Sequence, residues 1–153
     1  MNNNAASNEV QSIVRQISEH PIWQARKGHG SFVTLEMGKK LSRKRRDGTE
    51  ILSGEFHLWI YMCRWDLSHN GLSLLTSEDI DLKNLGLLAK LEGEFLQAIE
   101  VKDPHTVLLT LSNGFTFELT SMSEEISDHD YFILYAHDSC VAFNKQRGLY
   151  LEI

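Results

Sequence analysis

The residues whose types and spacing could act on a ligand lie in an alternating stretch, residues 54–67. In a β-strand, alternate side chains point to opposite faces of the sheet. One face of this stretch is purely apolar and is predicted to join the core: Phe56, Leu58, Ile60 and Met62. The other face combines aromatic area with polar groups: Glu55, His57, Trp59, Tyr61, Cys63 and Trp65.

From this mixed face we take five candidate ligand-binding residues, namely Glu55, His57, Trp59, Tyr61 and Trp65. Tryptophan and tyrosine offer apolar area together with a hydrogen-bond donor, so such a face can line a groove. The alternative is that a helix or loop of the same chain covers the face and satisfies its polar groups.

Cys63 and His57 are the residue types of a cysteine nucleophile and its histidine base. Six residues of extended strand separate them by roughly 20 Å, so they cannot form a hydrogen-bonded pair directly. Another histidine would have to fold over the thiol, and the sequence does not select one. The chain also lacks a nucleophile elbow, a phosphate-binding loop and a dinucleotide fingerprint, so we assign no catalytic residue and predict no cofactor.

A metal site needs three or four converging ligands. Glu55 and His57 are neighbours on one face, and His29 or His105 would have to arrive from elsewhere. A second cluster, residues 128–130, reads Asp-His-Asp, but adjacent loop residues rarely converge on one ion. We therefore assign no metal site.

The strongest charge signal is a run of six basic residues within residues 39–46, namely Lys39, Lys40, Arg43, Lys44, Arg45 and Arg46. The whole chain has a formal charge of −6, so the remainder without this run carries −12. The run precedes Asp47-Gly48, a turn signal, which predicts a protruding loop between two antiparallel strands. We take the six residues as a candidate docking site for an acidic partner or for nucleic-acid phosphates, the alternative being a solvated loop. The net charge argues against nucleic acid as a general partner.

Length and composition favour one domain over residues 1–153, with residues 1–6 frayed. No apolar run approaches the ~20 residues of a membrane span, and the first residues lack the apolar core of a secretory signal. Two cysteines without a CxxC pair fit a reducing cytoplasm.

The pattern of elements predicts an α+β fold that is mostly antiparallel β-sheet, arranged as a curved sheet, a sandwich or a partly open barrel. An amphipathic helix is expected over residues 8–19, because Val10, Ile13, Val14 and Ile17 form one stripe. A strand is expected over 31–37, a bend near 64–66, a short helix over about 81–90 and a closing meander over 131–153. For the hairpin over 106–120, burial of both strands selects a three-residue loop with Gly114 in the left-handed region.

Four segments together resemble a group of small bacterial proteins of unknown function: GSFVTLEMG at 30–38, GEFHLWIYMCRW at 54–65, LEG at 91–93 and NGF at 113–115. Some proteins of this size and acidity are encoded beside toxins as immunity proteins. The resemblance implies a bacterial, non-catalytic protein and supplies no catalytic residue.

Three functional classes follow from the sequence. The first is a non-catalytic protein-binding module, an immunity-type protein whose acidic surface would neutralise a basic toxin. The second is a small-molecule binder that uses the face of Trp59, Tyr61 and Trp65. The third is an enzyme with dispersed residues around Glu55, His57 and Cys63. A homodimer is compatible with all three and is expected, through a sheet edge or the N-terminal helix.

Overall fold

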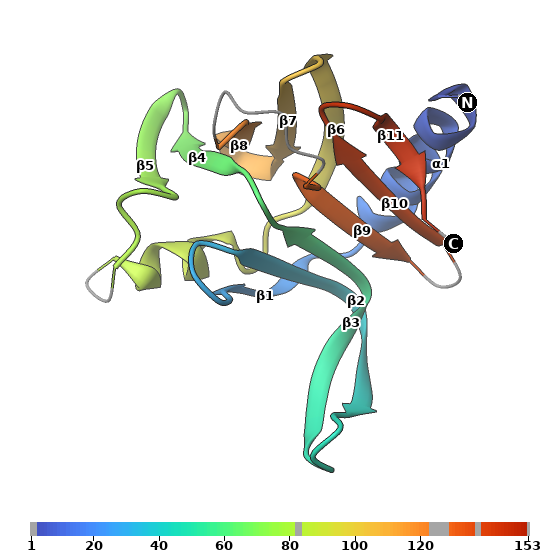
Figure 1. Ribbon diagram of the computed structural model, residues 1–153. Coiled ribbons are helices and arrows are strands. Elements are labelled where there is room, and N and C mark those ends of the chain that lie inside the picture. Colours follow the sequence, from blue (N-terminus) through green and yellow to red (C-terminus); the bar gives the residue numbers. More distant parts are fainter. Residues whose placement is uncertain (1–2, 82–83, 123–128, 137–138, 153) are drawn as a thin grey trace.

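The chain forms an α+β fold with two antiparallel sheets, which confirms the predicted fold class (Figure 1). The computed structural model describes residues 3–81, 84–122, 129–136 and 139–152. Apolar side chains from both sheets and from the helix form one continuous buried core. No helix in these described ranges is long and apolar enough to cross a membrane.

The first sheet carries the candidate site and has the strand order β1-β2-β3-β9-β10-β11. Its strands are β1 (Ile22–Lys27), β2 (Val33–Lys44), β3 (Glu50–Ile60), β9 (Phe132–Ala136), β10 (Ser139–Asn144) and β11 (Gly148–Leu151). In register, Leu35 pairs with Leu58, and Leu58 pairs with Leu134. These three side chains are fully buried, so this face of the sheet packs on the core and the opposite face points outward.

The second sheet has the order β5-β4-β8-β7-β6. Its strands are β4 (Arg64–His69), β5 (Leu72–Thr76), β6 (Leu96–Asp103), β7 (Thr106–Leu111) and β8 (Phe115–Thr120). Part of the helix predicted over residues 81–90 is present as the 3-10 helix η1 (Leu85–Leu91), while residues 82–83 lie outside the described ranges.

The hairpin β7–β8 confirms the predicted register. Leu109 pairs with Phe117 and Val107 pairs with Leu119, and all four side chains are buried. The connection is the three-residue turn η2 (Ser112–Gly114), in which Gly114 has a φ of +82°. Burial of both strands on one face therefore fixed the loop length, as expected.

The helix α1 (Asn3–Ile17) covers the edge of the core beside β6, β10 and β11. Its predicted stripe is buried, but the helix begins at Asn3 rather than Asn8. The prediction that residues 1–6 are frayed was therefore wrong for Asn3–Ala6, and residues 1–2 lie outside the description. The reason is that Ala6 precedes Val10 by one turn and is 2% exposed, so it extends the buried stripe.

The chain passes from the first sheet to the second at residues 61–63. The bend was predicted a few residues later, near 64–66. The backbone N–H groups of Tyr61 and Met62 donate to the carbonyl oxygens of Tyr131 and Asp130 at 2.9 and 3.0 Å. These hydrogen bonds pair the backbone N–H groups at the corner, where the chain leaves one sheet for the other. Even-numbered residues face the core before the corner, and odd-numbered residues face it afterwards.

The hairpin β2–β3 extends well beyond its sheet as a two-stranded ribbon (Figure 1). We call residues 39–50 of this hairpin the basic arm, and every one of them is exposed. The basic run protrudes between two antiparallel strands, as predicted, but the prediction that it is a loop was wrong for residues 39–44. These residues belong to β2, because residues 40–44 pair in register with β3, and only Arg45 and Arg46 of the run lie in the turn. Its tip is closed by Asp47, whose Oδ1 accepts hydrogen bonds from the backbone N–H and the hydroxyl of Thr49.

Candidate functional site

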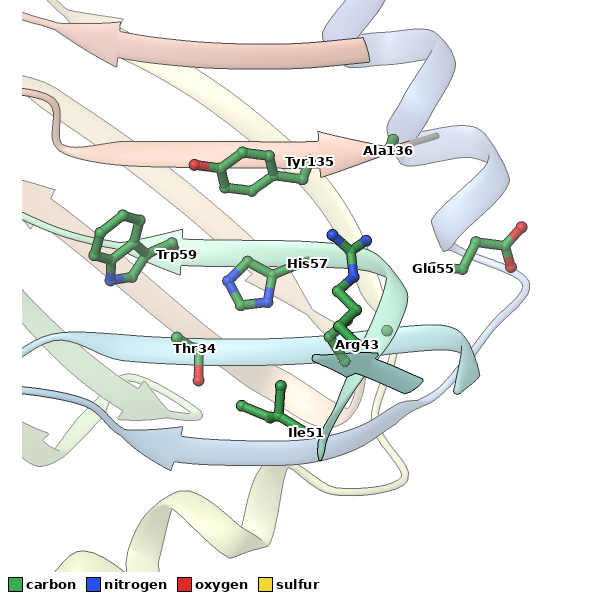
Figure 2. A pocket seen from close by; sticks show the side chains of 10 residues that line it. Thr34, Arg43, Ile51, Glu55, His57, Trp59, Tyr135 and Ala136 are labelled. Carbon is green, nitrogen blue, oxygen red and sulfur yellow. The ribbon is translucent and has the colours of Figure 1, made fainter. Parts of the chain in front are cut away.

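A pocket of about 480 Å³ lies on the outward face of the first sheet, where the basic arm leaves it (Figure 2). Strands β2, β3 and β9 and the base of the arm supply its walls. The side chains that matter for its chemistry are Thr34, Arg43, Ser53, His57, Trp59 and Tyr135. A concave site of this size can enclose a small organic molecule.

A hydrogen-bonded pair of His57 and Glu36 underlies the pocket. Nδ1 of His57 lies 2.5 Å from Oε2 of Glu36. The Glu36 side chain is 1% exposed, whereas His57 is 25% exposed and lines the pocket. A carboxylate only accepts hydrogen bonds, so Nδ1 carries the proton and Nε2 remains for a ligand.

The second oxygen of Glu36 is also satisfied. Oε1 accepts a hydrogen bond from the backbone N–H of Gly54 at 2.7 Å. Burial of a carboxylate is costly unless its oxygens find donors, and here both oxygens have one. Glu36 therefore holds the imidazole in place and offers no acceptor to the pocket.

This arrangement depends on an irregularity in the pairing of β2 with β3. The register shifts between Met37 and Lys40, beside Gly54. A Cβ atom on Gly54 would lie 2.5 Å from the carbonyl oxygen of Met37, so a larger residue does not fit. The missing side chain lets the two backbones approach, and the N–H of Gly54 then reaches Glu36.

Arg43 brings a positive charge into the pocket from the base of the basic arm. Its pairing partner across the hairpin is Ile51, which also lines the pocket. The side chain of Arg43 extends back toward His57 and Tyr135 rather than away from the sheet (Figure 2). One residue of the predicted docking run thus belongs to the same site as the predicted ligand-binding residues.

Aromatic rings form the apolar part of the site. The ring centroids of Trp59 and Tyr61 are 4.3 Å apart, and those of Tyr61 and Phe32 are 4.6 Å apart. The Tyr135 ring lies 5.7 Å from the His57 ring on the neighbouring strand. Trp59 and Tyr135 are part of the pocket wall, whereas Tyr61 packs on Trp59 outside it.

The side of the pocket beyond Tyr135 is acidic. Burial, followed by the nearby Cys140, Glu152 and Asp130, raises the pKa of the Tyr135 hydroxyl. Burial and Glu152 likewise raise the pKa of the Cys140 thiol to about 11. The charge across the site is therefore uneven, with Arg43 at one end and carboxylates beyond the other.

The structure separates the five predicted ligand-binding residues. His57 and Trp59 meet in the pocket, with Tyr61 packed beside them. Glu55 borders the pocket, but its side chain points away from His57 and its Oε1 accepts from the backbone N–H of Lys39 at 3.2 Å (Figure 2).

The placement of Trp65 on this face was wrong. Trp65 is 2% exposed in the core, where its Nε1 donates to the carbonyl of Ser31 at 2.7 Å. The reason is the corner at residues 61–63, which turns Trp65 inward together with Cys63.

The cysteine–histidine pair and the metal-ligand set considered from the sequence are not formed by these residues. Cys63 is buried, and burial raises the pKa of its thiol far above the usual range. Its thiol donates to the carbonyl oxygen of Tyr131 at 3.4 Å, and it lies in the core rather than on the His57 face. In the described ranges, no three His, Cys, Asp or Glu residues group as metal ligands, and residue 128 of the Asp-His-Asp cluster lies outside those ranges.

Sequence reasoning missed Glu36 and Tyr135 as site residues. In β2, Glu36 alternates with the buried residues Leu35 and Met37, and it pairs with His57 on β3. An acidic residue within an otherwise apolar strand was the available signal, but its partner 21 residues away depends on the register of β2 with β3.

Comparisons of the chain with protein-family models, curated proteins and solved structures found no match. The resemblance to small bacterial proteins of the immunity type therefore stays a prediction.

Proposed function

We propose that this protein binds a small organic molecule in the pocket beside His57 and Trp59. The observation that carries the proposal is the pocket itself, about 480 Å³ on the outward face of the first sheet. The outward face of an antiparallel sheet is usually polar and solvated. Here it is hollowed, and aromatic rings lie beside a fixed imidazole and a guanidinium.

The composition of the walls supports a binding role. Ligand pockets combine apolar and aromatic area with a few well-placed polar groups. Trp59, Tyr135 and Ile51 supply the apolar area, and His57 and Arg43 supply the polar groups. His57 is held by a buried carboxylate, so its orientation is set before a ligand arrives, which lowers the entropic cost of binding.

The three tryptophans provide the test, since only Trp59 lines the pocket. In a protein labelled with ¹⁵N, each indole N–H gives its own NMR signal. We expect hits from a library of small organic fragments to shift the Trp59 signal and leave that of Trp65 in place. Trp59→Ala should abolish binding of those hits, while Leu72→Ser, at an exposed leucine on the other sheet, should not. Hits that bind equally well to Trp59→Ala would contradict the proposal.

A second candidate function is protein or polyanion docking through the basic arm. The six cations of the arm take part in no ion pair within 4 Å in the described part of the chain. Lys40 lies 5.0 Å from the centroid of the Trp23 ring, and Arg43 faces the pocket. Lys44, Arg45 and Arg46 remain at the exposed end, where an acidic protein surface or nucleic-acid phosphates could be met.

Retention on a heparin column tests the arm. The variant Lys44→Gln/Arg45→Gln/Arg46→Gln should elute at lower salt than the parent. A matched variant, Arg15→Gln/Arg26→Gln/Lys90→Gln, removes three exposed cations elsewhere and should elute with the parent. Equal loss of retention in both variants would show that the effect is net charge and would remove the arm as a docking site.

The immunity-type role is a separate proposal, in which the acidic surface outside the basic arm meets a basic toxin; its support is the charge of −12 carried by the chain without the basic run. We also propose a homodimer formed through a sheet edge or the N-terminal helix. The proposed bacterial origin is based on the resemblance, and the proposed cytoplasmic location on the two cysteines without a CxxC pair.

A further inference from the structure

We propose that the ligand of the pocket is a small planar carboxylate, with its carboxylate on Arg43 and its apolar body against Trp59. The inference rests on the proposed binding function and names the chemical class of the ligand. Three features of the pocket support it: the charge and geometry of Arg43, the uneven charge across the site and the position of the aromatic wall.

The charged donor of the pocket is Arg43, which has only N–H groups to offer. Both oxygens of Glu36 are already occupied by His57 and Gly54, and Glu55 borders the site but points away from it. The Nδ1–H of His57 donates to Glu36, so its Nε2 presents a lone pair and is not the partner of an anion. The charged end of a ligand therefore meets the guanidinium with neither carboxylate directed at it, and an anion is the complement of that group.

The arrangement also gives the ligand a direction. Arg43 enters at the base of the basic arm, whereas Glu152 and Asp130 lie beyond Tyr135. The anionic end is therefore drawn to the Arg43 end and repelled from the other. Trp59 lies next to His57 on the same face of β3, so a planar apolar group attached to the carboxylate would lie against the indole ring.

The geometry of a guanidinium favours a carboxylate with one charge. Arginine binds a carboxylate through two parallel N–H···O bonds in one plane, a geometry that lysine cannot supply. Arg43 is the one arginine or lysine in the described wall, so a second negative charge on the ligand would be left without a cation.

The test is a matched pair of probes, 2-naphthoate and 2-naphthamide, which share a ring system and nearly share a shape but differ in charge. Affinities are measured by calorimetry, and the site is read from the indole N–H signals. We expect 2-naphthoate to bind at least about 10-fold more tightly, the scale of one charge-assisted hydrogen bond, and to shift the Trp59 signal.

Arg43→Gln should remove this preference, and Arg43→Lys should keep only part of it because the two-pronged contact is lost. Arg46→Gln is the control, since it removes the same charge from the exposed tip of the same arm and should change the affinity for 2-naphthoate less than about two-fold. Both arginines are exposed, so these variants should fold, and the spread of the NMR signals verifies it.

The outcomes separate the inference from the function on which it rests. Equal affinities for the two probes, with a shifted Trp59 signal, would overturn the carboxylate class and leave the binding function standing. An Arg46→Gln effect as large as that of Arg43→Gln would overturn the role given to Arg43. Absence of a Trp59 response to both probes and to the fragment library would overturn the inference together with the binding function.

Discussion

His57 and Glu36 form a hydrogen bond of 2.5 Å between adjacent strands, and the carboxylate of this pair is almost fully buried. The two residues pair directly across β2 and β3. Glu36 stabilises the fold because it accepts a hydrogen bond from the backbone N–H of Gly54. It also contributes to the pocket because it orients the ring of His57. This double use makes Glu36 the residue through which stability and binding are coupled.

Glu36→Ala should destabilise the protein more than Glu36→Gln. Alanine leaves the buried N–H of Gly54 without an acceptor, which costs about 1–3 kcal/mol, whereas the amide oxygen of glutamine can still accept. Urea unfolding of the two variants measures the difference. Equal free energies of unfolding would show that the hydrogen bond to Gly54 contributes nothing.

Gly54→Ala should destabilise the protein, because the new methyl group would meet the carbonyl oxygens of Met37 and Phe56 at 2.5 and 2.6 Å. Relief of such backbone contacts typically costs about 1–3 kcal/mol. Gly86→Ala is the matched control, since a Cβ there meets nothing within 4 Å. Thermal unfolding of both variants tests this, and a drop of similar size in the control would refute the steric explanation.

The two thiols should react in a fixed order with a thiol reagent. Burial raises the pKa of both, to about 11 for Cys140 and further for Cys63. The thiolate is the reactive form, so labelling of Cys140 should be slow at neutral pH and accelerate as pH rises toward about 11. Cys63 should react only after unfolding. Glu152→Gln removes a negative charge that raises the pKa of Cys140, so it should speed labelling at any given pH below that value.

Stability should fall at alkaline pH, in part because of Tyr150. Burial and the hydrogen bond from its hydroxyl to Asp130, 2.5 Å long, raise the pKa of Tyr150 well above its unfolded value of about 10. A proton held more tightly in the folded state stabilises it fully below about pH 10, and this contribution is lost as pH rises further.

Tyr150→Phe should therefore flatten the alkaline loss of stability, measured as the free energy of unfolding between about pH 8 and 11. At neutral pH the same variant loses a hydrogen bond to a carboxylate, about 1.5–3 kcal/mol. Asp130→Asn should lower the pKa of Tyr150 in a spectrophotometric titration. An unchanged tyrosine titration in that variant would contradict the role given to Asp130.

Local pattern was sufficient for much of this fold. The alternation of Phe56, Leu58 and Ile60 identified the core side of β3, and all three are buried. The hairpin β7–β8 was predicted in register because only one loop length buries both strands on one face. Each of these conclusions depends on neighbours in sequence, where periodicity carries the information.

The site was only partly predictable, because several of its contacts join residues that are far apart in the sequence. His57 and Trp59 were found because they lie on one strand, but Glu36 and Tyr135 reach them from β2 and β9. Those contacts depend on strand order and on the shift of register beside Gly54, which no local pattern reveals. Trp65 was misplaced because alternation continues in sequence across a corner where the strand changes sheet.

The strand order also has a kinetic consequence. Most neighbouring strands are consecutive in sequence, so their hairpins can close within short segments and form early. Two pairings are different: β4 with β8, which pairs Arg64 with Thr120, and β3 with β9, which pairs Ile60 with Phe132 and closes the longer stretch of chain. Pairing β3 with β9 costs more chain entropy than closing a hairpin between consecutive strands. We therefore expect formation of this pairing, which supports the pocket, to limit the folding rate.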